Sequence, residues 1–306
     1  AGDPWELLLD GECRYRSTAY FSICITNSET ILATCLASLC SLLATTDPEC
    51  VITFVSRWVY HVARDAFIRN GVLPVVAPEW SSLDPDHPYA HLQDRNYSFA
   101  SFEAFRLSQY DKVVAFDIDI LFMRNASSLS SIQPFSVSRI PKGKDPSQYI
   151  NTGITVLRPS LGLYSELVHA WRSGEYSLYY SDTHSAHQDV VQEVCISRRR
   201  CGPVSDLDAC VYNHGSWLPG PFSRRCSRLV VARHNFNTMR EPFLARLLEV
   251  AFRRGRCRAR IRNKLDLGGW GGEDVFGRFT PERCCDLDRS PGGDVQCWGR
   301  GFTYER

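Results

Sequence analysis

The sequence predicts an α/β fold built on a parallel sheet, followed by a disulfide-rich C-terminal extension. Across residues 20–76, β-branched and aromatic runs alternate with amphipathic runs, which is typical of parallel strands connected by helices. Residues 113–116 form a charge-free apolar run, as expected of a strand covered on both faces. Of the 13 cysteines, four lie within residues 257–297, where they can cross-link an extension of the chain.

The first strand and helix are the clearest elements. Residues 20–27 (YFSICITN) are rich in β-branched and aromatic side chains and predict a strand. Ser28 stands where it can cap the helix that follows, whose broad apolar face extends from Ile31 to Leu42. The next predicted elements are a strand at 51–55, a helix near 58–69 and a strand at 71–76.

The middle of the chain continues the same alternation. After an irregular polar stretch at 78–96, a helix from about 99 to 108 leads into the strand at 113–116. Ser160 begins an amphipathic helix directly after a predicted strand. The remaining predicted elements are a strand at 154–157, a helix within 184–195 and a strand that ends at His234.

Two carboxylates follow the central strand. Asp117 and Asp119 are separated by one residue, so on an extended backbone their side chains share a face while Ile118 points into the core. A divalent cation bound through oxygen would offset the cost of holding two carboxylates beside a core. The alternative is a strand end that releases two acidic residues into solvent. His234, at the end of a later apolar run, is either a structural histidine or a third metal ligand.

Composition restricts the class of protein. A formal net charge of +1 argues against a dedicated nucleic-acid binder. The longest apolar stretch, 31–44, is too short and too rich in Ser, Thr and Cys to span a bilayer, so a membrane anchor is expected only outside this sequence. The 306 residues show no signal peptide at the first residue, which suggests a processed or truncated start.

The cysteines predict an oxidising compartment. They show no C-x-x-C pair of the kind that zinc sites use, so disulfides are the better interpretation. Their grouping into 13–50, 195–226 and 257–297 predicts bridges local to each region, with one cysteine left over. The sequons at Asn96 and Asn125 agree with a Golgi or other secretory-pathway lumen, or with secretion.

Four segments, in this order, resemble glycosyltransferase family 8, the glycogenin-like retaining transferases of the GT-A fold. LSQYDKVVAFDIDILFMRN looks like the metal-binding strand of that family, and NTGITVLRPSLGLY is similar to its Asn-Ser-Gly strand and following helix. His187-Gln188-Asp189 stands at its Asp-Gln pair. The segment from His234 through Arg240 to Pro242 is similar to its His-x-x-Gly-x-x-Lys-Pro motif. The resemblance covers roughly residues 20–245.

The resemblance implies a GT-A-like fold, Rossmann-like, with a mostly parallel sheet flanked by helices. It implies that Asp117, Asp119 and His234 hold Mn²⁺ or Mg²⁺, and that the donor substrate is a UDP-sugar. The acceptor would be a glycan or glycoprotein. Gln188 would position the reacting carbon, with Asp189 beside it. The residues implied to contact the donor are Thr26, Asn27, Asp117, Ile118, Asn151, Gly153, Asn237 and Arg240.

The chain departs from the family pattern at four positions. They are Thr30 for a base-stacking tyrosine, Ser101 for a lysine, His187 for an acidic residue and Asn237 for a glycine. Arg240 can replace the family's lysine as a fixed cation against the diphosphate. These departures keep open a sugar-binding pseudo-transferase that does not turn its ligand over.

A second motif, GWGGED, lies near the C-terminus and resembles the acceptor motif of galactosyl- and N-acetylgalactosaminyl-transferases. In that interpretation Trp270 stacks on a sugar, Glu273 grips the acceptor and Asp274 acts as a base. A base at Asp274 would favour an inverting reaction, and the His-Asn pair at 234–235 leaves an arabinosyl- or xylosyl-type transferase open. The structural alternative is a glycine-rich turn around a buried tryptophan. The predicted organisation is a tether at 1–17, a catalytic domain at 18–245 and a cysteine-rich extension at 246–306.

Overall fold

The structure is a computed structural model that describes residues 13, 16–78, 99–139, 149–177, 186–214, 230–234, 242–255 and 257. Its main sheet has seven strands in the order β3-β2-β1-β4-β7-β6-β8. These strands are β1 (Thr18–Cys24), β2 (Val51–Val55), β3 (Val72–Val76), β4 (Lys112–Phe116), β6 (Ser136–Arg139), β7 (Ile150–Leu157) and β8 (Ser205–Asp206). Strand β7 runs against its neighbours β4 and β6, and the other paired strands of this sheet are parallel. The predicted α/β fold with a mostly parallel sheet is therefore confirmed.

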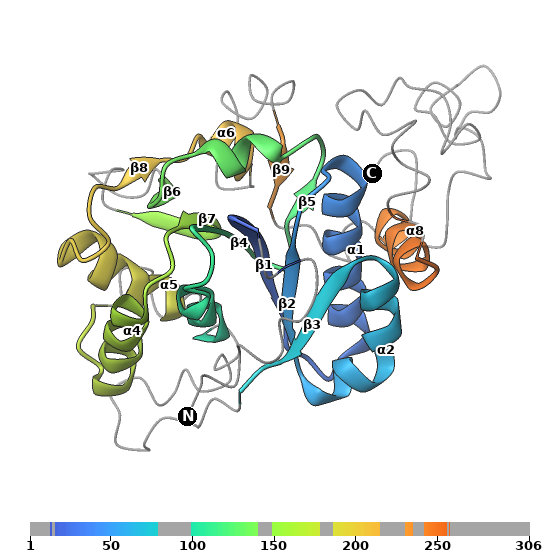
Figure 1. Ribbon diagram of the computed structural model, residues 1–306, viewed down its shortest axis with the longest axis horizontal. Coiled ribbons are helices and arrows are strands. Elements are labelled where there is room, and N and C mark those ends of the chain that lie inside the picture. Colours follow the sequence, from blue (N-terminus) through green and yellow to red (C-terminus); the bar gives the residue numbers. More distant parts are fainter. Residues whose placement is uncertain are drawn as a thin grey trace, which may run out of the picture.

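Helices cover both faces of the sheet (Figure 1). One layer holds α1 (Glu29–Thr45), α2 (Arg57–Arg69) and α8 (Pro242–Arg253). The other holds the 3₁₀ helix η3 (Ala100–Arg106), α4 (Leu161–Ser173), α5 (Ala186–Val191) and the π-helical turn η5 (Gln192–Ser197). The alternation of side chains along β1 shows the division, because Tyr20 packs with the first layer and Phe21 with the second.

Several elements differ from the expectation. The segment predicted as a helix at 99–108 is the 3₁₀ helix η3, and β7 begins four residues earlier than predicted. Ser28 occupies the N-cap position of α1 without a side-chain capping bond, whereas Ser160 accepts a hydrogen bond from Leu163 N at the start of α4. Elements not predicted are η4 (Ser127–Ser131), α6 (Ala209–Tyr212), β5 (Leu121–Phe122), β6, β8 and α8.

The disulfides are not all local, which corrects the expectation. Cys13–Cys50, Cys24–Cys35 and Cys195–Cys201 join neighbours within one cysteine group. Cys40–Cys257 instead joins α1 to the residue just beyond α8, across 217 residues. The reason is packing, because α8 lies against α1 and α2: Phe252 contacts Phe67 edge to face. Helix α8 also contains the predicted domain boundary at residue 245, so the division into domains stays a prediction.

A small second sheet lies beside the main one. It pairs β5 (Leu121–Phe122) with β9 (Ala232–Arg233) in antiparallel register. Strand β5 follows β4 after a turn, so this sheet brings the end of β9 to the carboxyl edge of β4. Within the described residues, no helix is long and apolar enough to cross a membrane.

Candidate functional site

Two carboxylates and one imidazole converge at the carboxyl end of β4. The ligand atoms of Asp117, Asp119 and His234 all lie within 4.8 Å of one another. Nε2 of His234 is 3.2 Å from Oδ1 of Asp119 and 3.9 Å from Oδ2 of Asp117. The sequence thus placed in one group the three residues that the structure brings together.

A turn, and not an extended strand, makes the two carboxylates converge. Strand β4 ends at Phe116, and the N–H of Ile120 donates to the carbonyl of Asp117 at 3.2 Å, which closes a turn over residues 117–120. Ile118 is only partly buried, whereas Ile120 is fully buried in the core. Ile118 still packs against the core, as expected, but the turn gives the fully buried place to Ile120.

His234 reaches the carboxylates through long-range pairing. The N–H of Met123 donates to the carbonyl of Val231 at 2.8 Å and continues the β5–β9 pairing. Directly after β9, the N–H of His234 donates to the carbonyl of His214 at 2.8 Å. The backbone is thus fixed on both sides of β9, and the imidazole is presented to Asp119.

When no cation is bound, the pKa values of two residues at this site are raised. Burial and then the neighbouring Asp119 carboxylate raise the pKa of Asp117 to about 7. Burial lowers the pKa of His234, but its hydrogen bond to Asp119 and the charges of both carboxylates outweigh burial and raise it overall. In mildly acidic solution a proton therefore competes with a cation for this site.

The donor atoms fit a divalent cation. An octahedral ion with ligand distances of about 2.1 Å keeps adjacent ligands about 3 Å apart. The His234–Asp119 separation of 3.2 Å is close to that value, and the 3.9 Å to Asp117 needs a small side-chain movement. A mixed set of carboxylate oxygens and imidazole nitrogen suits Mn²⁺ or a similar first-row ion.

A buried asparagine lies behind the histidine, and the sequence analysis missed it. Asn213, fully buried after α6, contacts Nδ1 of His234 through Oδ1 at 2.8 Å. Its Nδ2 donates to Oδ1 of Asn151 at 2.6 Å, and that oxygen also accepts the N–H of Gly153 at 2.9 Å. An isolated asparagine in an irregular segment carries no periodic signal, so only the three-dimensional pairing reveals it.

The structure places Asn151, Thr152 and Gly153 inside β7. The prediction placed them ahead of the strand and is therefore wrong. Helix α5 holds the first part of β7 in place. Oε1 of Gln188 accepts hydrogen bonds from the N–H of Thr152 at 2.8 Å and from its hydroxyl at 3.1 Å. Gln188 and Asp189 are both buried. The Gln188 oxygen thus orders the strand beside the carboxylates, whereas the predicted contact with the reacting carbon stays a prediction.

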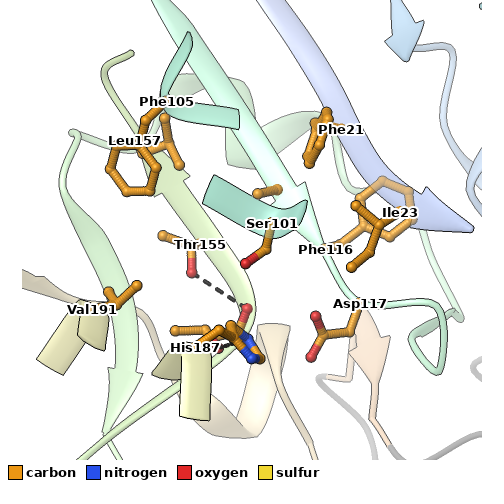
Figure 2. Close-up of a pocket in the computed structure, with 12 residues that line it drawn as sticks. Phe21, Ile23, Ser101, Phe105, Phe116, Asp117, Thr155, Leu157, His187 and Val191 are labelled. Atoms are coloured by element: carbon orange, nitrogen blue, oxygen red, sulfur yellow. Dashed lines mark hydrogen bonds between the residues drawn. The ribbon is translucent and has the colours of Figure 1, made fainter. Parts of the chain in front are cut away.

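A small cavity of about 30 Å³ adjoins Asp117. Figure 2 shows the Asp117 carboxylate, the Ser101 hydroxyl and the His187 ring around the same space, with aromatic and aliphatic side chains above them. Nε2 of His187 is 3.0 Å from the hydroxyl of Thr152, and its Nδ1 is buried without a hydrogen-bond partner. Burial lowers the pKa of His187 to about 4, so the ring is neutral at neutral pH. Two of the departures from the family pattern, Ser101 and His187, therefore line one cavity beside the carboxylates.

The other predicted residues divide into two groups. Thr26 and the exposed Asn27 lie just beyond β1, which pairs with β4, so they share the edge that carries Asp117. Thr26 is buried, and its hydroxyl accepts the N–H of Ser28 at 2.9 Å. The predicted residues outside the described part of the chain are Asn237, Arg240, Trp270, Glu273 and Asp274.

Comparisons with known proteins gave structural likenesses only. No protein-family model matches the sequence, and no curated protein matches it. Mouse xyloside xylosyltransferase 1, in its apo form, has a TM-score of 0.48 at 13% identity, covering 71% of this chain and 97% of that one. A galactosyltransferase, LgtC, in complex with donor and acceptor sugar analogs, has a TM-score of 0.49 at 11% identity, covering 75% and 95%. The glycosyltransferase GlyE of Streptococcus pneumoniae TIGR4 has a TM-score of 0.48 at 11% identity, covering 78% and 60%. At these scores we base the function on the geometry of the site.

Proposed function

We propose that this chain is a divalent-cation-dependent glycosyltransferase that transfers a sugar from a UDP-sugar to a glycan or glycoprotein acceptor, with retention of configuration. The observation that carries the proposal is the convergence of Asp117, Asp119 and His234 at the carboxyl end of a strand in a mostly parallel sheet. Ligands of such sheets bind beyond these strand ends. The resemblance of four ordered segments to glycosyltransferase family 8 supports the same reaction.

The residues divide the work between holding the donor and shaping its surroundings. A cation at the site would neutralise charge on the departing diphosphate. Asp117, Asp119 and His234 would hold that ion, and their mixed oxygen and nitrogen atoms favour Mn²⁺. Asn151 and Gln188 shape the wall beside it, and Gln188 has a positioning role and not a covalent one. The cavity at Ser101 and His187 would lie beside the donor sugar.

The compartment is part of the proposal. Disulfides at several points of the fold favour an oxidising compartment, such as the Golgi or another secretory-pathway lumen, or secretion. Asn125, the first residue of a sequon, is exposed, so a glycan there would meet solvent. The GWGGED segment remains the candidate for acceptor binding.

A second candidate function is sugar binding without turnover. The observation that favours it is the content of the cavity, where Ser101 and a neutral His187 replace the charged residues of the family pattern. Such a wall offers hydrogen bonds but little charge to stabilise a reacting centre. Both functions use the cavity to bind a sugar, but only the transferase needs the nucleotide and releases a product.

Thermal unfolding with Mn²⁺ and a panel of nucleotide sugars tests the proposal. We expect a rise in melting temperature that needs both Mn²⁺ and one UDP-sugar. The added free energy of unfolding should be about 2.7 kcal/mol when the ligand is at 100 times its Kd. Asp119→Ala should abolish the shift, and Asp65→Ala, which changes an exposed acidic residue of α2, should keep it. Release of UDP in the presence of acceptors separates the enzyme from the binding protein. No shift with any nucleotide sugar would refute the transferase and favour sugar binding without turnover, which a glycan array would then test.

A further inference from the structure

We propose that Asn213 is a positioning residue for the cation site, which accepts the Nδ1 proton of His234 and thereby directs the Nε2 lone pair toward the cation. The inference rests on the cation site of the proposed function and deepens it. It assigns a role to a residue that neither the sequence motifs nor the family resemblance includes.

The hydrogen bonds fix which way round the Asn213 amide lies. The side-chain atom of Asn151 that accepts the backbone N–H of Gly153 must be an oxygen, because an amide nitrogen cannot accept. Asn213 approaches that oxygen at 2.6 Å, so its near atom is the Nδ2 donor. The remaining atom, Oδ1, therefore faces Nδ1 of His234 at 2.8 Å.

An acceptor at Nδ1 fixes the histidine tautomer. Because Oδ1 of Asn213 can only accept, Nδ1 of His234 must carry a proton. The nitrogen left to coordinate a cation is then Nε2, which is the one that faces Asp119 at 3.2 Å. Turning the ring over would place a carbon against Asn213 and another against Asp119. Metal-binding histidines are commonly oriented by such a partner at the second nitrogen.

Burial excludes a direct role for Asn213. Its side chain has no exposed surface, so it cannot touch a substrate, and its influence must pass through His234. The backbone around it is tied to the same histidine, since the carbonyl of the next residue, His214, accepts the N–H of His234. Asn213 and His234 thus form one unit anchored on β7 through Asn151.

A double-mutant cycle in Mn²⁺ affinity tests this role without measuring activity. Binding of Mn²⁺ alone is followed by electron paramagnetic resonance for the wild type, Asn213→Ala, His234→Ala and the double variant. We expect Asn213→Ala to weaken binding by about 10–100-fold. In the His234→Ala background the same change should alter affinity by less than about 2-fold, because the residue through which Asn213 acts is gone. An equal loss in both backgrounds, or no loss in the wild type, would overturn the proposal.

A matched control and a second variant separate positioning from stability. Asn70→Ala removes another buried asparagine, which donates to the carbonyls of Ala66 and Phe252, and it should lower stability without changing Mn²⁺ affinity. Asn213→Asp keeps an acceptor for Nδ1 but sets an oxygen against Oδ1 of Asn151. It should therefore lower the melting temperature while binding Mn²⁺ more tightly than Asn213→Ala does.

The Asn213→Asp result stands even where Asn213→Ala does not fold. Affinity lost in Asn213→Asp as fully as in His234→Ala would mean that the acceptor at Nδ1 is not what matters, and would overturn the proposal. The outcome also separates the two levels of inference. A wild-type protein that binds no Mn²⁺ refutes the cation site itself, whereas binding without coupling to His234 refutes only the role of Asn213.

Discussion

The backbone of Gly153 lies directly against the imidazole ring of His234. A Cβ added at Gly153 would stand 2.4 Å from Cε1 and 2.5 Å from Nδ1 of that ring, and 2.8 Å from Oδ1 of Asn151. The φ of Gly153 is not in the left-handed region, so the glycine is required for space and not for backbone conformation. Strand β7 therefore has a glycine at this position because the histidine occupies the volume of a side chain.

Gly153→Ala should displace His234 and weaken Mn²⁺ binding by 10-fold or more, on the order of what loss of an orienting partner costs. Stability should fall by about 1–3 kcal/mol, as for an overpacked core. Mn²⁺ titration and urea unfolding measure the two effects. The control is Gly162→Ala in α4, where an added Cβ would meet only the Ser160 hydroxyl at 3.6 Å. That change should be neutral or slightly stabilising. Equal effects of the two substitutions would contradict the packing role of Gly153.

Stabilisation by Mn²⁺ should increase with pH. A cation must displace protons from its ligands, and Asp117, with its pKa raised to about 7, retains its proton in mildly acidic solution. Below pH 7 the cation competes with this proton, and above pH 7 it does not. We therefore expect the increase in melting temperature between EDTA and Mn²⁺ to be larger at pH 8 than at pH 5.5.

Comparing EDTA with Mn²⁺ at each pH removes the pH dependence of the metal-free protein. Asp117→Ala lacks the proton in question and a ligand, so its melting temperature should respond little to Mn²⁺ at either pH. A wild-type shift that is the same size at pH 5.5 and pH 8 would contradict competition between the cation and the proton.

His187 should make the protein less stable as the pH falls. Its pKa in the folded chain is about 4, below the ordinary value of 6.5, so the unfolded chain takes up the proton first. The stability associated with the neutral ring is complete above pH 6.5 and is lost as the pH falls toward 4. Relative to His187→Gln, the wild type should lose about 1–3 kcal/mol between pH 7 and pH 4.5.

Urea unfolding of the wild type and of His187→Gln at the two pH values measures this difference. The pH-dependent contribution of Asp117 is the same in both proteins and cancels. His61→Gln serves as the control, because the His61 ring is exposed on α2 and folding leaves it in water. A wild-type and His187→Gln pair with the same difference at both pH values would mean that the ring is hydrated in the folded protein.

The carboxylate pair was predictable because its signal is local. An apolar, charge-free run identifies a buried strand, and Asp117 and Asp119 follow it directly. His234 was found by the same reasoning, since it ends another apolar run. The turn that makes the carboxylates converge was not predicted, because the spacing of two aspartates is the same in a strand and in a turn.

Features set by distant contacts could not be predicted in this way. Asn213 becomes relevant only when β9 pairs beside His214 and brings His234 to it. The polar residues at the start of β7 looked like a loop, because the side chains that satisfy their backbone N–H groups, Gln188 and Gln192, lie about 40 residues later. The same limit applies to disulfide pairing, where spacing favoured local bridges and the packing of α8 on α1 decided otherwise.

The bridge between Cys40 and Cys257 should contribute more to stability than the bridge between Cys195 and Cys201. A disulfide restricts the unfolded chain, and the effect grows with the logarithm of the enclosed loop. The loops span 217 and 6 residues, which corresponds to about 5 and about 2 kcal/mol at 25 °C in the chain-entropy model. Replacing each pair by alanine and measuring urea unfolding compares them directly. Equal losses would contradict the chain-entropy account and would favour a long bridge that acts by holding α8 against α1 in the folded state. In that case Phe252→Ala, which removes the edge-to-face contact with Phe67, should cost much less in the bridge-free variant than in the wild type.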